Sequence, residues 1–153
     1  MELKYVCVVK TTLQTKYSLF YADGIRLTYG NCLIACIASI LEEQIDEVPN
    51  IYTFYGLDDP ENTETENHLW FKIINLWLEK KHKKVLIKHK LGEETNEEFV
   101  IMRGLSMKMK PHTCIYKNEN GKLLPYFDPH PTKQYLHQTQ FYFTIENIWK
   151  SSL

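Results

Sequence analysis

The stretch that decides the fold is Gly30-Asn31-Cys32-Leu33-Ile34-Ala35-Cys36-Ile37-Ala38-Ser39-Ile40-Leu41. Its apolar side chains recur at the i, i+3, i+4 and i+7 spacing of an α-helix that buries one face. Asn31 is a good N-cap residue, so the pattern predicts a helix from Cys32 to about Glu43. Cys32 is therefore expected in the first turn of an apolar helix, directly after a turn signal at Gly30-Asn31.

A cysteine in the first helical turn has a specific chemical environment. The N-terminus of a helix presents unpaired N–H groups and a partial positive charge, and both favour the thiolate over the thiol. Because the thiolate is the nucleophilic form, Cys32 is a candidate nucleophile. The position alone does not decide the matter, since a free cysteine more often serves as a small buried hydrophobic residue.

Beyond this helix, the sequence predicts a second helix followed by strands. A second apolar stripe indicates a helix from about Glu66 to Lys80. The residues of this stripe are Trp70, Ile73, Ile74, Trp77 and Leu78. Strands are predicted over residues 5–9, 85–87, 99–102, 113–117, 123–127 and 141–144. Because the helices precede most of the strands, the order favours an α+β fold over a parallel βαβ sheet.

The composition indicates a single globular domain spanning residues 1–153, since this length favours one domain. Hydrophobic residues make up 44% and charged residues 24%, which excludes a disordered chain. The 18 Lys and Arg are balanced by 19 Asp and Glu, so we expect no broad positive surface and no nucleic-acid partner.

The sequence further predicts a cytoplasmic protein that does not insert into a membrane. No apolar run approaches the roughly 18 residues of a transmembrane helix. The apolar run Tyr5–Val9 is also too short for a signal peptide. Four cysteines are too few for a disulfide scaffold, so we expect free thiols in a reducing cytoplasm. These cysteines are Cys7, Cys32, Cys36 and Cys114.

Two further residues complete a candidate catalytic set. His112 opens one predicted strand and Asp128 follows the next. The turn signal Asn120-Gly121 pairs these strands as a hairpin, which returns Asp128 to the end at which His112 begins. A carboxylate there can orient the imidazole and fix its tautomer, while the other ring nitrogen faces the thiol of Cys32. His112 as a strand-edge residue and Asp128 as a turn residue are the structural alternatives, and the ordered set of three favours catalysis.

These residues resemble those of papain-like cysteine peptidases. The motif Gly30-Asn31-Cys32-x-x-Ala35-Cys36-x-Ala38-Ser39-x-Leu41, followed by Val48-Pro49, is similar to their active-site helix. A compact branch of that superfamily, related to bacteriocin-leader (double-glycine) peptidases, includes small bacterial and phage proteins. Its His and Asp segments resemble Gly104-x-Ser106, His112, Gly121 and Asp128-Pro129-His130-Pro131. The resemblance covers residues from about 14 to 136 and implies a papain-like α+β fold whose active-site helix packs on an antiparallel sheet.

The resemblance also implies roles for the catalytic residues. Cys32 is then the nucleophile, His112 the general base and acid, and Asp128 the residue that orients the histidine. The expected function is a cysteine hydrolase, a peptidase or amidase, that acts on a peptide or other amide-containing substrate through a thioester and needs no cofactor. The alternatives are an inactive binding or inhibitory module of the same fold and an acyl transferase with the same triad.

The donors for the oxyanion depart from the papain pattern. Papain-like enzymes place a Gln shortly before the nucleophile, where it assists the backbone N–H of the cysteine. Here the upstream Gln is Gln14, eighteen residues before Cys32. Residues 17–29 are then interpreted as an inserted loop that returns Gln14 to the site. Gln14 is the preferred donor, and the alternatives are Asn31, Arg26 or a site that lacks this donor.

A zinc site is another use of the same cysteines. Cys32 and Cys36 together with His112 and Cys114 supply thiol and imidazole donors, but the Cys-x-x-x-Cys spacing is unlike that of common structural zinc ligand pairs. Strand alternation places Cys114 on the same face as His112. We therefore expect no metal, with zinc kept as an alternative, and Cys36 is interpreted as part of the helix core. His130, which stands between two prolines, is interpreted as a turn residue.

Overall fold

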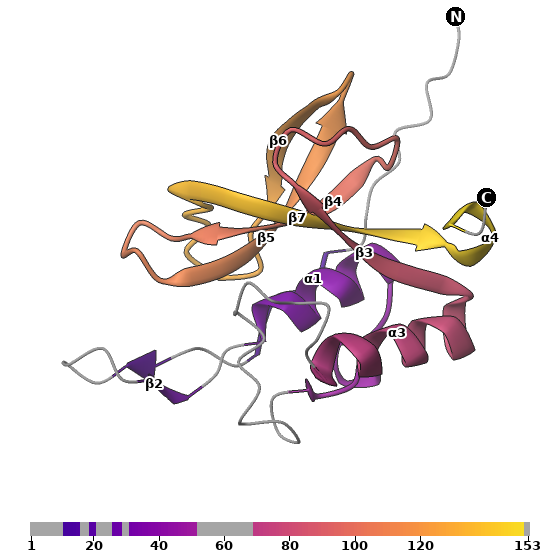
Figure 1. Cartoon of the computed structure of the whole chain (residues 1–153). Helices are drawn as coiled ribbons and strands as arrows, with labels where there is room; N and C mark the ends of the chain where they lie inside the picture. The colour runs from indigo at the N-terminus through magenta and orange to yellow at the C-terminus, as the bar shows by residue number, and fades with distance from the viewer. Residues whose placement is uncertain (1–10, 16–18, 21–25, 29–30, 52–68, 152–153) are drawn as a thin grey trace, which may run out of the picture.

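Figure 1 shows a computed structural model of the chain, which describes residues 11–15, 19–20, 26–28, 31–51 and 69–151. The strand predicted at residues 5–9 and the predicted start of the second helix at residues 66–68 lie outside the described residues. The elements are β1 (Leu19–Phe20), β2 (Arg26–Thr28), α1 (Cys32–Leu41), the 3-10 helix η1 (Ile45–Glu47), α3 (Leu69–His82), β3 (Lys84–Lys90), β4 (Phe99–Leu105), β5 (Pro111–Glu119), β6 (Lys122–Phe127), β7 (Gln138–Asn147) and α4 (Ile148–Ser151).

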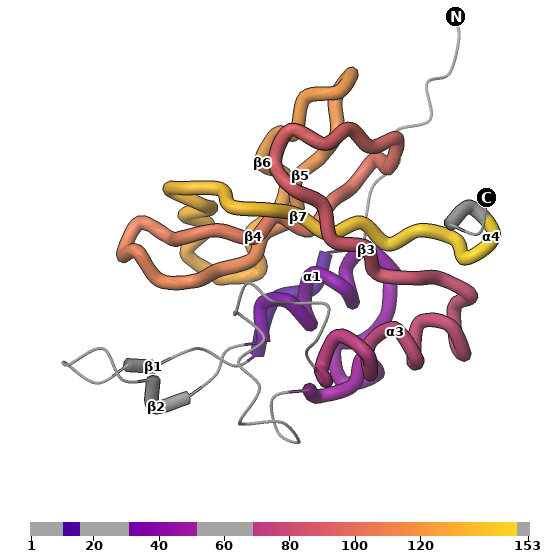
Figure 2. Tube along the Cα trace, viewed as in Figure 1, coloured from indigo at the N-terminus to yellow at the C-terminus, as the bar shows by residue number. Residues whose placement is uncertain are grey.

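A five-stranded antiparallel sheet forms the centre of the described part of the chain. Its strand order is β3-β7-β4-β5-β6, so β7, the last strand in sequence, lies between β3 and β4 (Figure 2). The short strands β1 and β2 form a separate antiparallel pair. Together with the helices α1 and α3, this sheet confirms the predicted α+β class.

The boundaries of the elements differ from the predicted ones for local reasons. β3 and β5 each extend beyond the predicted ranges 85–87 and 113–117, because backbone pairing continues through residues whose side chains are polar. α1 ends at Leu41, two residues earlier than predicted. Glu42 takes a left-handed φ of 55°, and the N–H of Glu43 donates to the carbonyl of Ala38 at 2.9 Å, which closes the helix.

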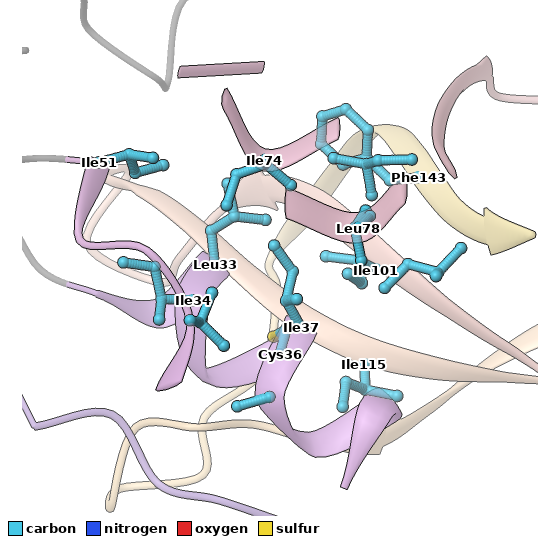
Figure 3. Close-up of a cluster of buried hydrophobic side chains, with 14 of the residues drawn as sticks. Leu33, Ile34, Cys36, Ile37, Ile51, Ile74, Leu78, Ile101, Ile115 and Phe143 are labelled. Atoms are coloured by element: carbon cyan, nitrogen blue, oxygen red, sulfur yellow. The ribbon is translucent and has the colours of Figure 1, made fainter. Parts of the chain in front are cut away.

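The main core lies between the two long helices and one face of the sheet. Figure 3 shows side chains from α1, α3 and the strands converging on this core. Trp70, Ile74 and Leu78 of α3 are buried, as the predicted stripe requires. The members labelled in Figure 3 are Leu33, Ile34, Cys36, Ile37, Ile51, Ile74, Leu78, Ile101, Ile115 and Phe143. A second buried cluster consists of Val100, Met102, Cys114, Tyr116 and Tyr142.

This core fixes where α1 begins relative to the sheet. α1 packs on β5 and β4, and the Cys36 thiol donates to the carbonyl oxygen of Thr113 at 3.6 Å. The contact places the first turn of α1, with Cys32, beside the start of β5. Within the described residues, no helix combines the length and the apolar character needed to cross a membrane.

Candidate active site

The N-terminus of α1 is fixed by a segment from far upstream. Asn31 occupies the N-cap position, but its side chain makes no capping hydrogen bond. Instead its Oδ1 accepts from the N–H of Thr15 and its Nδ2 donates to Thr15 Oγ1, both at 2.9 Å. Asn31 is therefore the N-cap residue, as predicted, but its side-chain amide binds Thr15 in place of the helix N–H groups.

The same upstream segment places Gln14 close to the predicted catalytic residues. Along α1, the N–H of Thr12 donates to Ser39 Oγ at 2.8 Å. The N–H of Gln14 donates to the carbonyl of Pro129 at 3.1 Å. Gln14 is 5% exposed and lies between the start of α1 and the residue that follows Asp128. Arg26, the other alternative donor, lies in β2, and its side chain is outside the described structure.

His112 and Asp128 meet at one end of the β5–β6 hairpin. His112 Nε2 lies 2.6 Å from Asp128 Oδ1, and the side chains are 12% and 2% exposed. The hairpin turn consists of Asn120 and Gly121 with φ angles of 54° and 87°, the left-handed pair that a tight two-residue turn needs. The spacing of sixteen residues between His112 and Asp128 thus becomes a direct contact.

Gly104, in the neighbouring strand β4, allows the backbone to pack closely at this end of the sheet. Gly104 pairs with His112, and at Gly104 the register between β4 and β7 shifts. A Cβ atom on Gly104 would overlap the backbone carbonyl of Gln138. The Gly104 in the predicted Gly-x-Ser segment therefore has a packing role directly beside the histidine.

The Asp128 carboxylate is held by donors on several sides. Oδ1 accepts from His112 and from the N–H of His130 at 2.9 Å, and Oδ2 accepts from the N–H of Tyr135 at 2.8 Å. Burial acts to raise the pKa of Asp128, but the hydrogen bonds from His112 and the two backbone amides outweigh burial and hold the pKa below its usual range. Asp128 therefore stays ionised and fixed in position.

The His112 ring is in contact with two thiols in addition to Asp128. Burial acts to lower the pKa of His112, but the hydrogen bond to Asp128 and the adjacent thiols of Cys114 and Cys32 raise it to about 12. Since Nε2 is bound to Asp128, Nδ1 is the nitrogen that remains to exchange a proton with Cys32. The structure thus brings Cys32, His112 and Asp128 together, with Gln14 beside them.

Cys114 is a close neighbour of His112 that the catalytic prediction does not use. It is fully buried, and its Sγ, a ring nitrogen of His112 and a carboxylate oxygen of Asp128 all lie within 4.8 Å of one another. Burial raises the pKa of Cys114 to about 11, so it is a thiol at neutral pH. The signal in the sequence is its position two residues after His112, on the same face of the strand.

Cys36 and His130 have structural roles. Cys36 is fully buried in the core, as predicted, and burial raises its pKa well above the usual value. His130 Nδ1 accepts from the N–H of Thr132 at 3.2 Å, which is consistent with the predicted turn role. Cys36 bonds to Thr113, whereas His130 donates its N–H to Asp128 Oδ1 at 2.9 Å and its ring lies edge-on to the ring of His112.

Comparisons with known proteins found no matching family model, no matching curated protein and no matching solved structure.

Proposed function

We propose that this protein is a cysteine-nucleophile hydrolase, a peptidase or amidase of papain-like fold. One observation carries the proposal. His112 holds Asp128 at 2.6 Å through Nε2, and the same imidazole contacts the thiol of Cys32 at the first turn of α1. Nucleophile, base and orienting carboxylate in mutual contact are the arrangement that thiol hydrolases require.

In the first half of the reaction, the Cys32 thiolate attacks the carbonyl carbon of the substrate amide. The electron pair of the carbonyl moves to its oxygen, and on collapse of this intermediate the C–N bond breaks. The His112 imidazolium transfers its proton to the leaving amine. A thioester between Cys32 and the acyl part of the substrate remains, and His112 is neutral.

In the second half, His112 acts as a base. It takes a proton from a water molecule as the water oxygen attacks the thioester carbonyl. Collapse of the second intermediate expels Cys32 as a thiolate and releases a carboxylic acid, and His112 is again an imidazolium. Asp128 keeps its charge throughout and holds the ring so that Nδ1 faces the sulfur.

The oxyanion in both halves needs two donors. The backbone N–H of Cys32 lies in the first turn of α1, at the positive end of the helix dipole. For the second donor we propose the Gln14 side chain, because the amide of Asn31 is engaged with Thr15. Gln14 is held next to Asp128 by its bond to Pro129.

The proposal includes a reducing compartment such as the cytoplasm and a peptide or other amide-containing partner. Cys32, Cys36 and Cys114 all carry free thiols, and such a compartment keeps them reduced. The nucleophile has to be a free thiol, so an oxidising compartment would compete with the proposed activity.

The test compares the wild type with Cys32→Ala and Cys36→Ala on a panel of peptides, isopeptides and cell-wall fragments. Cys36 is the matched control, because it is a buried thiol one turn further along α1 that bonds to Thr113. Hydrolysis by the wild type and Cys36→Ala but not by Cys32→Ala, with a covalent acyl adduct on Cys32 by intact mass, supports the proposal.

Other outcomes contradict it and identify an alternative. Products joined to an added amine in place of a free acid indicate an acyl transferase. Peptide binding without turnover, together with alkylation of Cys32 by iodoacetamide no faster than that of the unfolded chain, indicates an inactive binding module.

A further inference from the structure

Two loops border the proposed site, and most of their side chains have no part in the proposed reaction. Loop 106–110 connects β4 to β5, and loop 128–137 connects β6 to β7. Because His112 is the second residue of β5, the first loop ends just before it (Figure 1). The N–H of His137 donates to the carbonyl oxygen of Leu105 at 2.8 Å, which ties the second loop to the base of the first. Both loops therefore lie at the end of the sheet that carries His112.

The charges at this end of the sheet differ from those at the opposite end. Between Phe99 and Ile145 the sequence contains two carboxylates, Glu119 and Asp128. Glu119 lies at the opposite end of β5, where its carboxylate and that of Glu98 are each 4.0 Å from Lys117 Nζ. Asp128 is buried, with 1% of its surface exposed. The two loops add three lysines, so their exposed ionic groups are positive. These lysines are Lys108, Lys110 and Lys133.

The ammonium group of Lys133 lies directly beside the backbone of Asp128. Lys133 Nζ donates to the carbonyl oxygen of Asp128 at 3.1 Å and lies 4.0 Å from the ring centroid of Phe127. The residue is exposed to solvent. An ammonium group has three N–H donors, so the bond to one carbonyl leaves donors for a ligand. Lys133 is therefore a positive charge held in place at the edge of the site.

Lys108 supplies a second positive charge from the other loop. It is exposed at the middle of loop 106–110. Its side chain is close enough to that of His130 for the two to interact electrostatically, and the N–H of Lys133 donates to the carbonyl of His130 at 3.1 Å. The ring of His130 lies edge-on to that of His112, with 6.3 Å between their centroids. Both lysines are therefore neighbours of one residue that borders the proposed base.

Loop 106–110 has a defined conformation and exposes two methionines. The N–H of Ser106 donates to the carbonyl of Lys110, and the N–H of Met109 donates to the carbonyl of Ser106, both at 2.8 Å. Met107 and Met109 are 60% and 53% exposed. Methionine has a flexible, polarisable side chain that adapts to apolar partners of different shapes. Because hydrogen bonds already order the loop, binding a partner here costs little backbone entropy.

We propose that these two loops bind the substrate and that the substrate is an acidic peptide. Carboxylates of the peptide contact Lys108 and Lys133, and an apolar side chain of the peptide contacts Met107 and Met109. This assignment rests on the proposed hydrolysis and names its substrate class. Opposite charge favours such a peptide over a neutral or basic one. A nucleic acid would need a longer series of cations along its phosphates, and the 18 Lys and Arg of this chain are balanced by 19 Asp and Glu.

The binding test uses the full chain with Cys32→Ala, which removes the proposed nucleophile and prevents turnover. The probes are rhodamine-labelled peptides of Leu and Ser that carry Glu, Gln or Lys at the same positions. Fluorescence anisotropy at low salt should show the Glu peptide binding about 5-fold or more tightly than the Gln peptide, since one exposed ion pair contributes up to about fivefold. The Lys peptide should bind more weakly than both. High salt should reduce these preferences, because ions screen exposed charges.

Variants that remove one charge locate the contact. Lys108→Gln and Lys133→Gln should each lower the ratio of Glu-peptide to Gln-peptide affinity by about two- to fivefold, and Lys108→Arg and Lys133→Arg should preserve it. Lys122→Gln is the matched control, because it removes one exposed charge at the far end of the β5–β6 hairpin. Met107→Ser should weaken binding of both peptides and leave their ratio unchanged, since it removes apolar surface and no charge.

Thermal unfolding checks that each variant is folded, and the two lysines test the proposal independently. Equal binding of the Glu and Gln peptides, no binding of the Glu peptide, or an equal loss in Lys122→Gln would overturn the acidic-peptide surface. Unchanged binding in Met107→Ser would overturn the apolar contact.

Hydrolysis tests the same preference in the unmodified chain and keeps the two proposals apart. Digestion of a mixed peptide library should give cleavage sites enriched in neighbouring Asp and Glu. Lys108→Gln should raise KM for these sites with little change in kcat, because the ionic contact is the same in the ground state and the transition state. Lysine-dependent binding of the Glu peptide by a chain that hydrolyses nothing overturns the hydrolase but not the surface. Hydrolysis without a preference for acidic sites overturns only the surface.

Discussion

Each end of α1 lies beside a histidine paired with a carboxylate, and the surroundings of the two pairs differ. At the N-terminal end, His112 Nε2 lies 2.6 Å from Asp128 Oδ1. Beyond the C-terminal end, His82 Nε2 lies 3.0 Å from Glu43 Oε1. The Asp128 side chain is 2% exposed and that of Glu43 is 17% exposed.

The residues around the two pairs differ more than the histidine–carboxylate distances do. Glu43 also binds the Lys81 ammonium at 3.0 Å, so a competing cation shares its charge. The other carboxylate oxygen of Asp128 accepts from a backbone amide, that of Tyr135. His112 contacts two thiols, whereas the ring of His82 packs against Trp77. Under the proposed function, the N-terminal pair suits catalysis because the His112 ring that binds Asp128 also contacts the thiol of Cys32.

Removing the histidine should give the largest difference in activity between the two pairs. We expect His112→Ala to lower kcat/KM by about 10⁴-fold or more, as loss of the base does in comparable triads. His82→Ala should leave kcat/KM unchanged, because His82 contacts Glu43 and Trp77 beyond the opposite end of α1. Hydrolysis of the substrate that the panel identifies provides the measurement. Similar losses in both variants would show that the effect is one of stability and not of chemistry.

A smaller effect is expected at the proposed oxyanion donor. Gln14→Ala should lower kcat by about 10²–10³-fold with a smaller change in KM, because the interaction forms in the transition state. Asn31→Ala is the control, since its amide fastens Thr15 to the helix. That variant should lose thermal stability and keep more of its kcat than Gln14→Ala. A KM effect without a kcat effect in Gln14→Ala would contradict the oxyanion role.

The sequence predicts the contact between His112 and Asp128 well, because features close together in the sequence determine it. The Asn120-Gly121 turn sets the register of the hairpin, and alternation along β5 relates His112 to Cys114. These are short-range rules of backbone geometry. The approximate positions of α1 and α3 follow in the same way from the period of their apolar residues.

The features that the sequence does not predict depend on contacts between distant segments. The insertion of β7 between β3 and β4 is a choice of strand order, and no local pattern encodes it. Similarly, the side chain of Asn31 matches a helix cap, but Thr15 competes for its amide across sixteen residues. Gln14 reaches Pro129 through this same tertiary network.

The stability conferred by the buried pair should depend on pH in a defined window. The pKa of His112 is raised to about 12 against burial, by Asp128 and the thiols, from an ordinary 6.5. Its contribution is therefore fully present below pH 6.5 and is lost as pH rises towards 12. The pKa of Asp128 is lowered, so its contribution is present above its ordinary pKa of 3.8 and is lost as pH falls.

The comparison of wild type with Asp128→Asn measures this contribution. The difference in free energy of unfolding, from urea denaturation, should be largest between the two ordinary pKa values of 3.8 and 6.5. It should decrease on both sides of that window. A difference that stays constant from acid to alkaline pH would show that Asp128 acts through packing and not through its charge.

The ion pair between Lys81 and Glu43 should give the smallest effect on stability, and that effect should depend on salt. The hydrogen bond from Lys81 holds the pKa of Glu43 below its usual 4.5, against burial, so any stabilisation is present above that pH and is lost as pH falls. Water and salt screen this pair, so Glu43→Gln should lower Tm slightly at low salt and not at high salt. The effect of Asp128→Asn should persist at high salt, because its partners are shielded from solvent. If salt removed both effects equally, solvent exposure would not be what separates the two ends of α1.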